Sequence, residues 1–269
     1  MSGTGDAAFS GSVPAAYDRY LVPLLFEPYA DDLARRAARL GAANILEVAA
    51  GTGVVTRRLA EALPEARITA TDLNPDMLAF VRPLESARVA LAVVDAQALP
   101  FADKLFDLVI CQYGYMFVPD RALAYREAAR VLRPGGQILF NVWDDIADND
   151  AANAVNVALA EAFPDDPPRF LERGPFSYHD HALIEAELAA AGFDDIAIER
   201  VEMESQVADP RGAVDGFIKG NPLAAELAER DPVTVAAAYD RARQQIADKL
   251  RQGPLGMAAL VVSATTQRD

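Results

Sequence analysis

The segment Asn44–Thr56 constrains the fold of this chain more than any other stretch. It opens with a short apolar run that one carboxylate, Glu47, interrupts, and it continues through a turn of small residues that ends at Gly53. A helical pattern of apolar residues follows the turn. A buried strand, a glycine turn and a helix allow the backbone to approach a ligand closely, because glycine has no Cβ and the first helical amides are free to donate. The segment therefore predicts a nucleotide-type cofactor site.

The same turn differs from the pattern of dinucleotide-binding proteins. Their fingerprint, G-x-G-x-x-G, has a third glycine that eases the packing of the helix against the strand. Thr56 stands at that position here, and Glu47 suits a cationic ligand better than a phosphate. The string from Glu47 to Gly53 resembles the first motif of the class I S-adenosylmethionine (SAM) methyltransferases, in the branch that includes the quinone-biosynthesis C-methyltransferases. Ala49 replaces the first glycine of that motif, which is tolerated if its φ is negative.

A second predicted strand, 66–72, ends in an acid, Asp72. A carboxylate at this point can accept hydrogen bonds from two ribose hydroxyls, so Asp72 is the strongest single candidate for a ligand contact. Asn74 and Pro75 then predict the start of a helix, as its N-cap and its first residue. An NAD-dependent enzyme also carries an acid here, so Asp72 alone does not identify the cofactor.

The third predicted strand, 89–95, ends in a second acidic motif. In the resembled family an aspartate at this strand end receives the adenine amino group, and the next backbone amide meets a ring nitrogen; Asp95 and Ala96 match that pattern. The concurrence of motifs at successive strand ends favours SAM over a dinucleotide. The cofactor-binding residues that the resemblance implies are Tyr17, Tyr20, Glu47, Ala49, Gly51, Thr52, Gly53, Asp72, Leu73, Met77, Asp95, Ala96, Gln97 and Gln112.

The loop 113–117, after the fourth predicted strand, is where members of the family place cofactor and acceptor side by side. Its aromatic rings and methionine sulfur suit a methyl group carried on a sulfonium, and core packing explains them equally well. No obligatory side-chain base can be assigned from the sequence. The groups to test are Tyr113, Tyr115, His179 and His181.

Composition and charge narrow the class of partner. The formal net charge of −15 opposes nonspecific binding to nucleic acid or to an anionic membrane. No stretch has the apolar length of a membrane span, and residues 1–12 show no signal-peptide pattern. The single cysteine, Cys111, excludes an internal disulfide framework, and the two histidines have no further Cys or His to complete a zinc site. We therefore expect a cytoplasmic protein with a small-molecule partner and no metal, either a monomer or a homodimer.

The order of the predicted elements indicates the α/β class, with a doubly wound, mostly parallel, seven-stranded sheet and helical cover segments. This is the Rossmann-like fold of the resembled family, in which the last two strands form an antiparallel hairpin; here an insertion lies between them. Pro23 and Pro28 are expected to break the helical pattern near the N-terminus. Residues 1–12 are expected to be disordered and 13–269 to form one domain, with a core of 41–143, 180–208 and 254–269 and a cover of 13–40, 144–179 and 209–253.

The resemblance implies SAM-dependent methyl transfer to a small-molecule acceptor, with S-adenosylhomocysteine as the product. Oxygen, nitrogen and carbon acceptors all remain open. A noncatalytic SAM-binding module is an alternative that the sequence does not separate from an enzyme. An NAD(P)-dependent oxidoreductase is a weaker alternative, because Glu47, Ala49 and the missing third glycine disfavour it.

Overall fold

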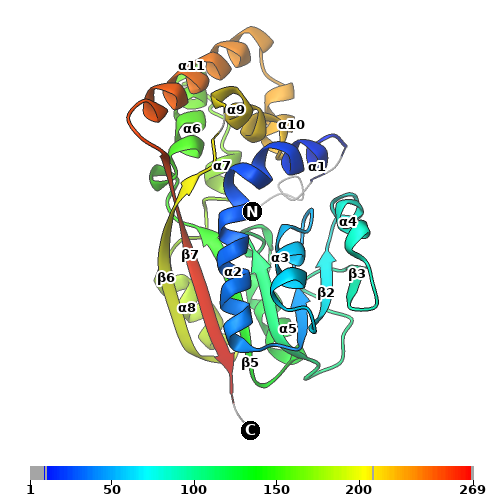
Figure 1. Ribbon diagram of the computed structural model, residues 1–269. Coiled ribbons are helices and arrows are strands. Elements are labelled where there is room, and N and C mark those ends of the chain that lie inside the picture. Colours follow the sequence, from blue (N-terminus) through cyan, green and yellow to red (C-terminus); the bar gives the residue numbers. More distant parts are fainter. Residues whose placement is uncertain (1–8, 10, 208, 268–269) are drawn as a thin grey trace.

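Strand β1 (Asn44–Glu47) lies inside a seven-stranded sheet and pairs in parallel with a strand on each side. The computed structural model describes residues 9, 11–207 and 209–267, and the strand order within them is β3-β2-β1-β4-β5-β7-β6 (Figure 1). The buried run Ile45 to Val48 is apolar apart from Glu47, as expected of a parallel strand with both faces covered. The other strands are β2 (Arg67–Asp72), β3 (Val89–Val93), β4 (Phe106–Gln112), β5 (Leu132–Trp143), β6 (Phe193–Ser205) and β7 (Leu255–Thr266).

Strand β7 runs antiparallel to both of its neighbours, β5 and β6. The strands from β1 to β5 pair with one another in parallel. These pairings confirm the mostly parallel, doubly wound sheet and the antiparallel pairing of its last two strands. The chain between β6 and β7 forms the predicted helical insertion, with helices α9 (Pro210–Lys219), α10 (Leu223–Ala228) and α11 (Pro232–Leu250).

Helices cover both faces of the sheet (Figure 1). Helix α2 (Glu27–Leu40) packs on α3 (Val54–Ala62) over one face, and α5 (Arg121–Val131) packs on α8 (His181–Ala190) over the other. Helix α4 (Pro75–Val81) lies against β2 and β3, and it begins as predicted, with the Asn74 side chain accepting from the backbone of Asp76. Short 3₁₀ turns are η2 (Arg82–Leu84), η3 (Tyr115–Phe117) and η4 (Ile146–Asp148).

The remaining helices gather beyond the end of the sheet that carries the carboxyl ends of the parallel strands, at the top of Figure 1. Helix α11 packs on α6, and α9 packs on η1. Among the described residues, no helix is long and apolar enough to cross a membrane. Besides α9, α10 and α11, this cover contains α1 (Val13–Ala16), η1 (Tyr17–Phe26), α6 (Asp150–Ala162) and α7 (Phe170–Arg173).

The N-terminal stretch consists of the shorter pieces α1 and η1 followed by the longer helix α2, without a loop between them. The expectation that two prolines divide this stretch agrees with the structure only at the junction of η1 and α2, next to Pro28. Pro23 lies inside η1, which has the wider π-helical hydrogen-bond pattern. Pro28 lies in the first turn of α2, where the missing N–H has no intrahelical partner to lose. Between α1 and α2 the helical stretch changes direction (Figure 1).

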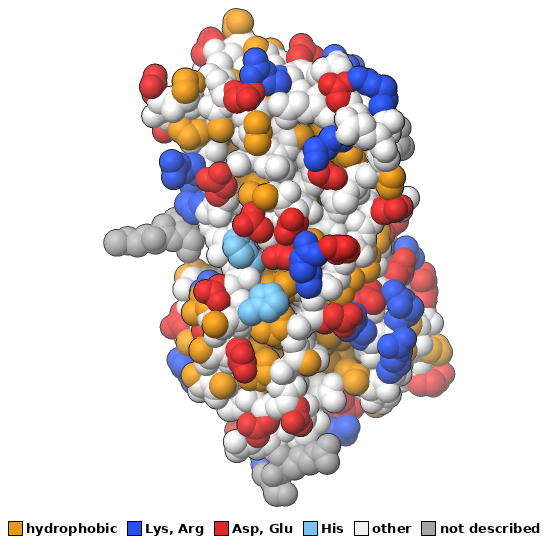
Figure 2. Space-filling view, turned by 90° about the vertical axis from the view of Figure 1, so that its left-hand side faces the viewer, with side chains coloured by type: hydrophobic (Ala, Val, Ile, Leu, Met, Phe, Trp, Pro, Cys, Tyr) orange, Lys and Arg blue, Asp and Glu red, His pale blue; other side chains and the backbone are white. Residues whose placement is uncertain are grey.

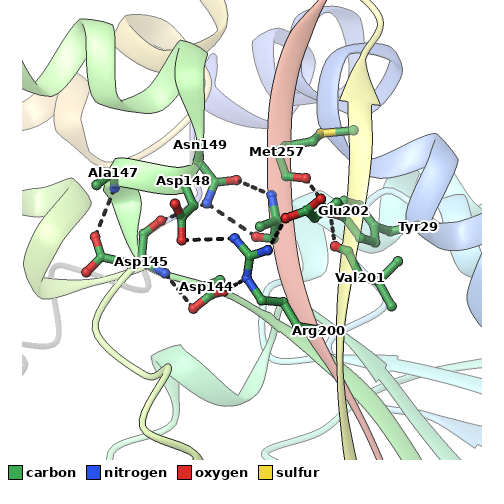
Figure 3. A network of polar contacts seen from close by, with 11 residues as sticks. Tyr29, Asp144, Asp145, Ala147, Asp148, Asn149, Arg200, Val201, Glu202 and Met257 are labelled. Atoms are coloured by element: carbon green, nitrogen blue, oxygen red, sulfur yellow. Dashed lines mark hydrogen bonds and ion pairs between the residues drawn. The ribbon is translucent and has the colours of Figure 1, made fainter.

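Arg200 on β6 anchors the chain where it leaves β5 (Figure 3). Its Nε atom donates to Asp144 Oδ2 at 2.6 Å, and one of its terminal nitrogens lies 3.0 Å from Asp148 Oδ2. Asn149 pairs with the backbone of Ala258 on β7 through its Nδ2, at 3.2 Å, and its Oδ1, at 3.1 Å. These bonds hold the start of α6 against the sheet, so the cover is built from a fixed base.

Two glycines set the distance between α9 and η1. A Cβ added at Gly216 would lie 2.9 Å from Leu21 Cδ2 and 3.2 Å from Tyr20 Cβ, which is too close for both neighbours to stay in place. A Cβ at Gly212, one turn earlier, would meet Tyr20 Cδ1 at an ordinary 3.9 Å. The close contact at Gly216 brings η1 down onto the cavity described below.

This pair of glycines provides a matched test of the packing. We expect Gly216→Ala to be less stable than Gly212→Ala by about 1–3 kcal/mol, because only the first substitution overpacks a buried contact while both gain the same helix propensity. Chemical denaturation followed by far-ultraviolet circular dichroism measures the difference. Equal unfolding midpoints for the two variants would show that η1 and α9 do not pack as closely as described.

Candidate functional site

A cavity opens at the carboxyl ends of the parallel strands, between the sheet and the cover. Its empty volume is ≈ 1240 Å³, part of it open to solvent. Ligands of doubly wound sheets bind at this edge.

The glycine turn after β1 forms one wall of the cavity. Gly51 has a φ of 58°, and a Cβ there would lie 3.6 Å from Met77 Cε and 3.8 Å from the Tyr17 hydroxyl. The condition set for Ala49, a negative φ, is not met, because its φ is 53°. An alanine in this left-handed region costs about 1–2 kcal/mol. The turn therefore keeps a strained backbone at the place where it faces the cavity.

Gly114 allows the loop after β4 to approach that turn. A Cβ at Gly114 would lie 2.5 Å from Ala49 Cβ and 2.6 Å from Cys111 Sγ. Cys111 itself is fully buried in the strand, and burial raises the pKa of its thiol to about 12. Its thiolate is absent at neutral pH, so Cys111 acts as a small packing residue.

The Asp72 carboxylate joins the ends of two strands. One oxygen accepts from Gly51 N at 2.8 Å and the other from Asn74 N at 2.8 Å. Burial raises the pKa of this carboxyl, and the two backbone hydrogen bonds oppose that rise. Each oxygen keeps a lone pair, and Asp72 lines the cavity, so it can still accept from a pair of ligand hydroxyls.

The segment after β3 supplies the next part of the wall. Asp95, Ala96 and Gln97 all line the cavity. Asp95 Oδ1 accepts from Gln97 N at 2.8 Å and from Gln97 Nε2 at 3.0 Å, while Gln97 Oε1 accepts from Asp120 N at 3.0 Å. The Gln97 side chain thus holds the loop together, and the Asp95 carboxylate retains lone pairs for a ligand donor.

Glu47 does not line the cavity. It is 1% exposed, and its Oε2 accepts from Thr56 Oγ at 2.6 Å. Burial raises the pKa of its carboxyl to about 8, with the Thr56 hydrogen bond acting in the opposite direction. Glu47, which argued against a dinucleotide cofactor, is therefore buried and hydrogen-bonded to the helix that follows the glycine turn.

The two tyrosines of η1 have different positions relative to the cavity. Tyr17 lines the cavity, and burial, followed by the charge of Asp72, raises the pKa of its hydroxyl. Tyr20 does not line the cavity and packs against α9 at Gly216, with the Arg19 guanidinium carbon 5.1 Å from its ring centre. Only Tyr17 is placed to touch a ligand.

Of the four groups proposed for testing as bases, Tyr113 alone lines the cavity. Tyr115 is buried between Tyr125 and Phe140, with ring centres 4.7 and 5.0 Å away. Figure 2 shows both histidine side chains on an outer face of the molecule. His179 is held through its Nδ1 atom by the carbonyl of Phe176 at 3.1 Å, and the side chain of His181 is exposed. The structure therefore brings none of these three groups to the cavity.

Of the residues predicted to bind the cofactor, some line the cavity and others do not. Tyr20, Glu47, Thr52 and Gly53 do not line the cavity. Those that do are Tyr17, Ala49, Gly51, Asp72, Leu73, Met77, Asp95, Ala96, Gln97 and Gln112.

Most lining residues that the sequence did not single out come from the cover. Their segments were expected to enclose an acceptor, but the sequence carries no signal that points an individual side chain inward. Trp143, which ends β5 at the edge where ligands bind, lies outside the cover, as do Val94, Val118 and Pro119. Phe9 lies in the stretch 1–12, which was expected to be disordered, yet it lines the cavity. Residues 1–8 and residue 10 lie outside the described chain. The lining residues concerned are Phe9, Leu21, Leu25, Phe26, Val94, Val118, Pro119, Trp143, Phe170, Leu171, Pro175, Phe176, Phe217 and Asn221.

The buried Glu47 predicts a pH-dependent stability. Its pKa in the folded chain, about 8, lies above the value of 4.5 for an unhindered carboxyl. Its contribution to folding is therefore complete below pH 4.5 and is lost as the pH rises through about 8, at up to about 1.4 kcal/mol per pH unit.

Glu47→Gln keeps a partner for Thr56 and removes the titration. We expect the variant to lose less stability than the parent between pH 5.5 and 8, measured as the free energy of unfolding in urea at each pH. Glu65→Gln removes the same charge from an exposed position and serves as the control. Parallel pH profiles for the parent and both variants would contradict the burial of an uncharged Glu47.

The chain is also similar in sequence to known proteins. Residues 46–140 match the family model described as a methyltransferase domain. A stretch of 180 residues is 31% identical to the ubiquinone/menaquinone biosynthesis C-methyltransferase UbiE of Dinoroseobacter shibae, and it covers 62% of this chain and 70% of that protein. Over 97 residues the chain is 37% identical to the malonyl-[acyl-carrier protein] O-methyltransferase of Hahella chejuensis, covering 36% of this chain and 35% of that protein.

The matched part is thus about a third of the length of the second relative, and further curated relatives are matched over 37% to 46% of theirs. Among solved structures, the phosphoethanolamine N-methyltransferase 2 of Haemonchus contortus in complex with SAM has a TM-score of 0.62 at 18% identity, covering 98% of this chain and 59% of that one. At this identity the likeness concerns the fold alone.

Proposed function

Because the chain belongs to the family of class I SAM-dependent methyltransferases, we propose that it transfers a methyl group from SAM to a small-molecule acceptor bound in the cavity. The observation that carries this proposal is the continuity of the cavity. Its lining joins the glycine turn and the ends of β2 and β3 to an apolar space beneath the cover. A noncatalytic SAM-binding module would need the part of the cavity at the strand ends but not the apolar space.

The described residues fit SAM. Gly51 leaves room for a ligand against the turn, and the Asp72 carboxylate offers acceptors for the two ribose hydroxyls. Asp95 and the backbone of Ala96 suit the adenine edge, since one accepts and the other donates. Gln112 donates from its Nε2 to Phe26 O at 3.2 Å, which leaves its buried Oε1 without a partner among the described residues. That orphaned acceptor suits the ammonium group of the cofactor.

When bound, SAM would supply an electrophilic methyl carbon on a sulfonium; the acceptor would bond to it with its own electron pair and lose any proton it carries, and the electrons of the broken carbon–sulfur bond would remain on sulfur in S-adenosylhomocysteine.

The described lining residues contain no His, Lys, Arg or Glu, and burial raises the pKa of both the Tyr17 and the Tyr113 hydroxyl. Neither tyrosine is ionised at neutral pH, so neither acts as a base there. The chain contributes by holding the two reactants in line and excluding water, an effect worth as much as about 7–11 kcal/mol of the barrier.

The test of this site is the affinity for S-adenosylhomocysteine of two variants from neighbouring positions. Asp72→Ala should weaken binding about tenfold, because the hydrogen bonds to the ribose are lost. Asp76→Ala removes the same charge from an exposed residue four positions on, and we expect it to bind as the parent does. Isothermal titration calorimetry measures both, with circular dichroism as a check of folding.

Equal affinities for the two variants would place the cofactor elsewhere. SAM and NADH titrated in parallel provide the wider comparison, and binding of NADH alone would overturn the proposal in favour of an oxidoreductase. Formation of S-adenosylhomocysteine from SAM, dependent on an added acceptor, separates an enzyme from a binding module.

A further inference from the structure

The part of the cavity away from the strand ends has a uniform lining. We call it the acceptor chamber. Nine of its ten side chains are apolar, and the cover supplies all of them except that of Trp143. Its residues are Leu21, Leu25, Phe26, Trp143, Phe170, Leu171, Pro175, Phe176, Phe217 and Asn221.

Aromatic rings form the largest surfaces of the chamber. The Trp143 ring lies 5.9 Å from the Phe176 ring at an interplanar angle of 28° and 6.1 Å from the Phe26 ring. Two rings from outside the chamber adjoin them: Tyr113 stacks on Trp143 at 3.9 Å and 10°, and Tyr17 stacks on Phe26 at 4.9 Å. Walls made of flat rings favour a flat ring as their ligand, because offset stacking adds about 0.5–1.5 kcal/mol per pair to the burial of apolar area.

The chamber provides no compensation for a charged acceptor. Within the described lining of the whole cavity, the ionisable carboxylates are Asp72 and Asp95, both at the strand ends, and no Lys, Arg or His is present. A carboxylate or phosphate on the acceptor would lose its hydration without gaining a counter-charge, which is strongly unfavourable in an apolar environment. Acceptors with such groups are therefore disfavoured.

Asn221 is the one polar side chain of the chamber. It is 7% exposed, and its Oδ1 accepts from Leu223 N at 2.9 Å, which fixes the amide at the start of α10. Among the described residues nothing accepts from its Nδ2 atom, which leaves a fixed donor at an apolar surface. A ligand oxygen is the natural partner of such a donor.

The geometry points to an uncharged, planar aromatic acceptor that carries an oxygen substituent, with Asn221 donating to that oxygen and thereby orienting the ring. This inference rests on the proposed function, since it concerns the second reactant of the same site. It makes Asn221 and the aromatic side chains of the chamber, among them Trp143 and Phe176, the determinants of specificity.

Three probes of one carbon skeleton test the acceptor class. 2-Naphthol is planar and uncharged, 6-hydroxy-2-naphthoate adds a carboxylate, and decahydro-2-naphthol keeps the hydroxyl but has no aromatic ring. Each is titrated by calorimetry into the full chain saturated with S-adenosylhomocysteine. We expect 2-naphthol to bind and the other two to bind about tenfold more weakly or not at all.

The outcomes separate the two levels of the proposal. Absence of S-adenosylhomocysteine binding overturns the proposed function. Binding of that ligand without binding of 2-naphthol overturns the acceptor class alone. Equal affinity for the naphthoate contradicts the requirement for an uncharged acceptor, and equal affinity for the saturated alcohol contradicts the requirement for a planar ring.

Asn221→Asp tests the role of the amide. The new side chain still accepts from Leu223 N, so the hydrogen bond at the start of α10 is kept, but a carboxylate oxygen replaces the Nδ2 donor. We expect the affinity for S-adenosylhomocysteine to be unchanged and the affinity for 2-naphthol to fall about fivefold or more, since a donor is replaced by a negative charge. Asn153→Asp makes the same change on α6, outside the cavity lining, and should leave both affinities as in the parent. Equal loss in both variants, or no loss in Asn221→Asp, would remove Asn221 from the acceptor site.

Discussion

The Asp72 carboxylate is the contact on which the arrangement of the site depends. It accepts from the backbone of the glycine turn and from the backbone at the start of α4, so one side chain fixes the spacing between the ends of β1 and β2. Neighbouring strands end at the same edge of a parallel sheet, and a carboxylate can serve several donors there. The same group then offers its remaining lone pairs to the cavity. The side chain that fixes this spacing is thus also the one proposed to bind the ribose of the cofactor.

Close backbone packing has a similar double effect. Ala49 has a left-handed backbone, and the contact at Gly114 leaves no room for a Cβ. Together they bring the turn after β1 and the loop after β4 close to each other. On the cover, Gly216 lets η1 descend onto α9 in the same way. In each case the absence of a side chain lets two segments approach, and their other side chains then enclose the cavity between sheet and cover.

The cover gives the site its chemical character. Its helices come from three separated parts of the chain, and the bonds of Arg200 and Asn149 hold the middle part against the sheet. The chamber that results is aromatic and almost without charge, although the chain as a whole has a net charge of −15. Acidic residues lie mainly on the surface, where water solvates them, and the interior face of the cover remains apolar.

The sequence by itself determined the sheet, the strand-end motifs and most of the cavity lining at the strand ends. Local patterns report these features directly, since a buried run, a glycine turn and an acid at a strand end are contiguous in the chain. It could not decide that Glu47 lies behind the turn and Tyr17 in front of it, or that Tyr113 faces the cavity while His179 and His181 stay outside. Nor could the sequence show that Trp143, Phe176 and Asn221 line the same cavity. Side-chain direction and contacts between distant segments follow from how helices pack on the sheet, and that packing depends on the whole chain at once.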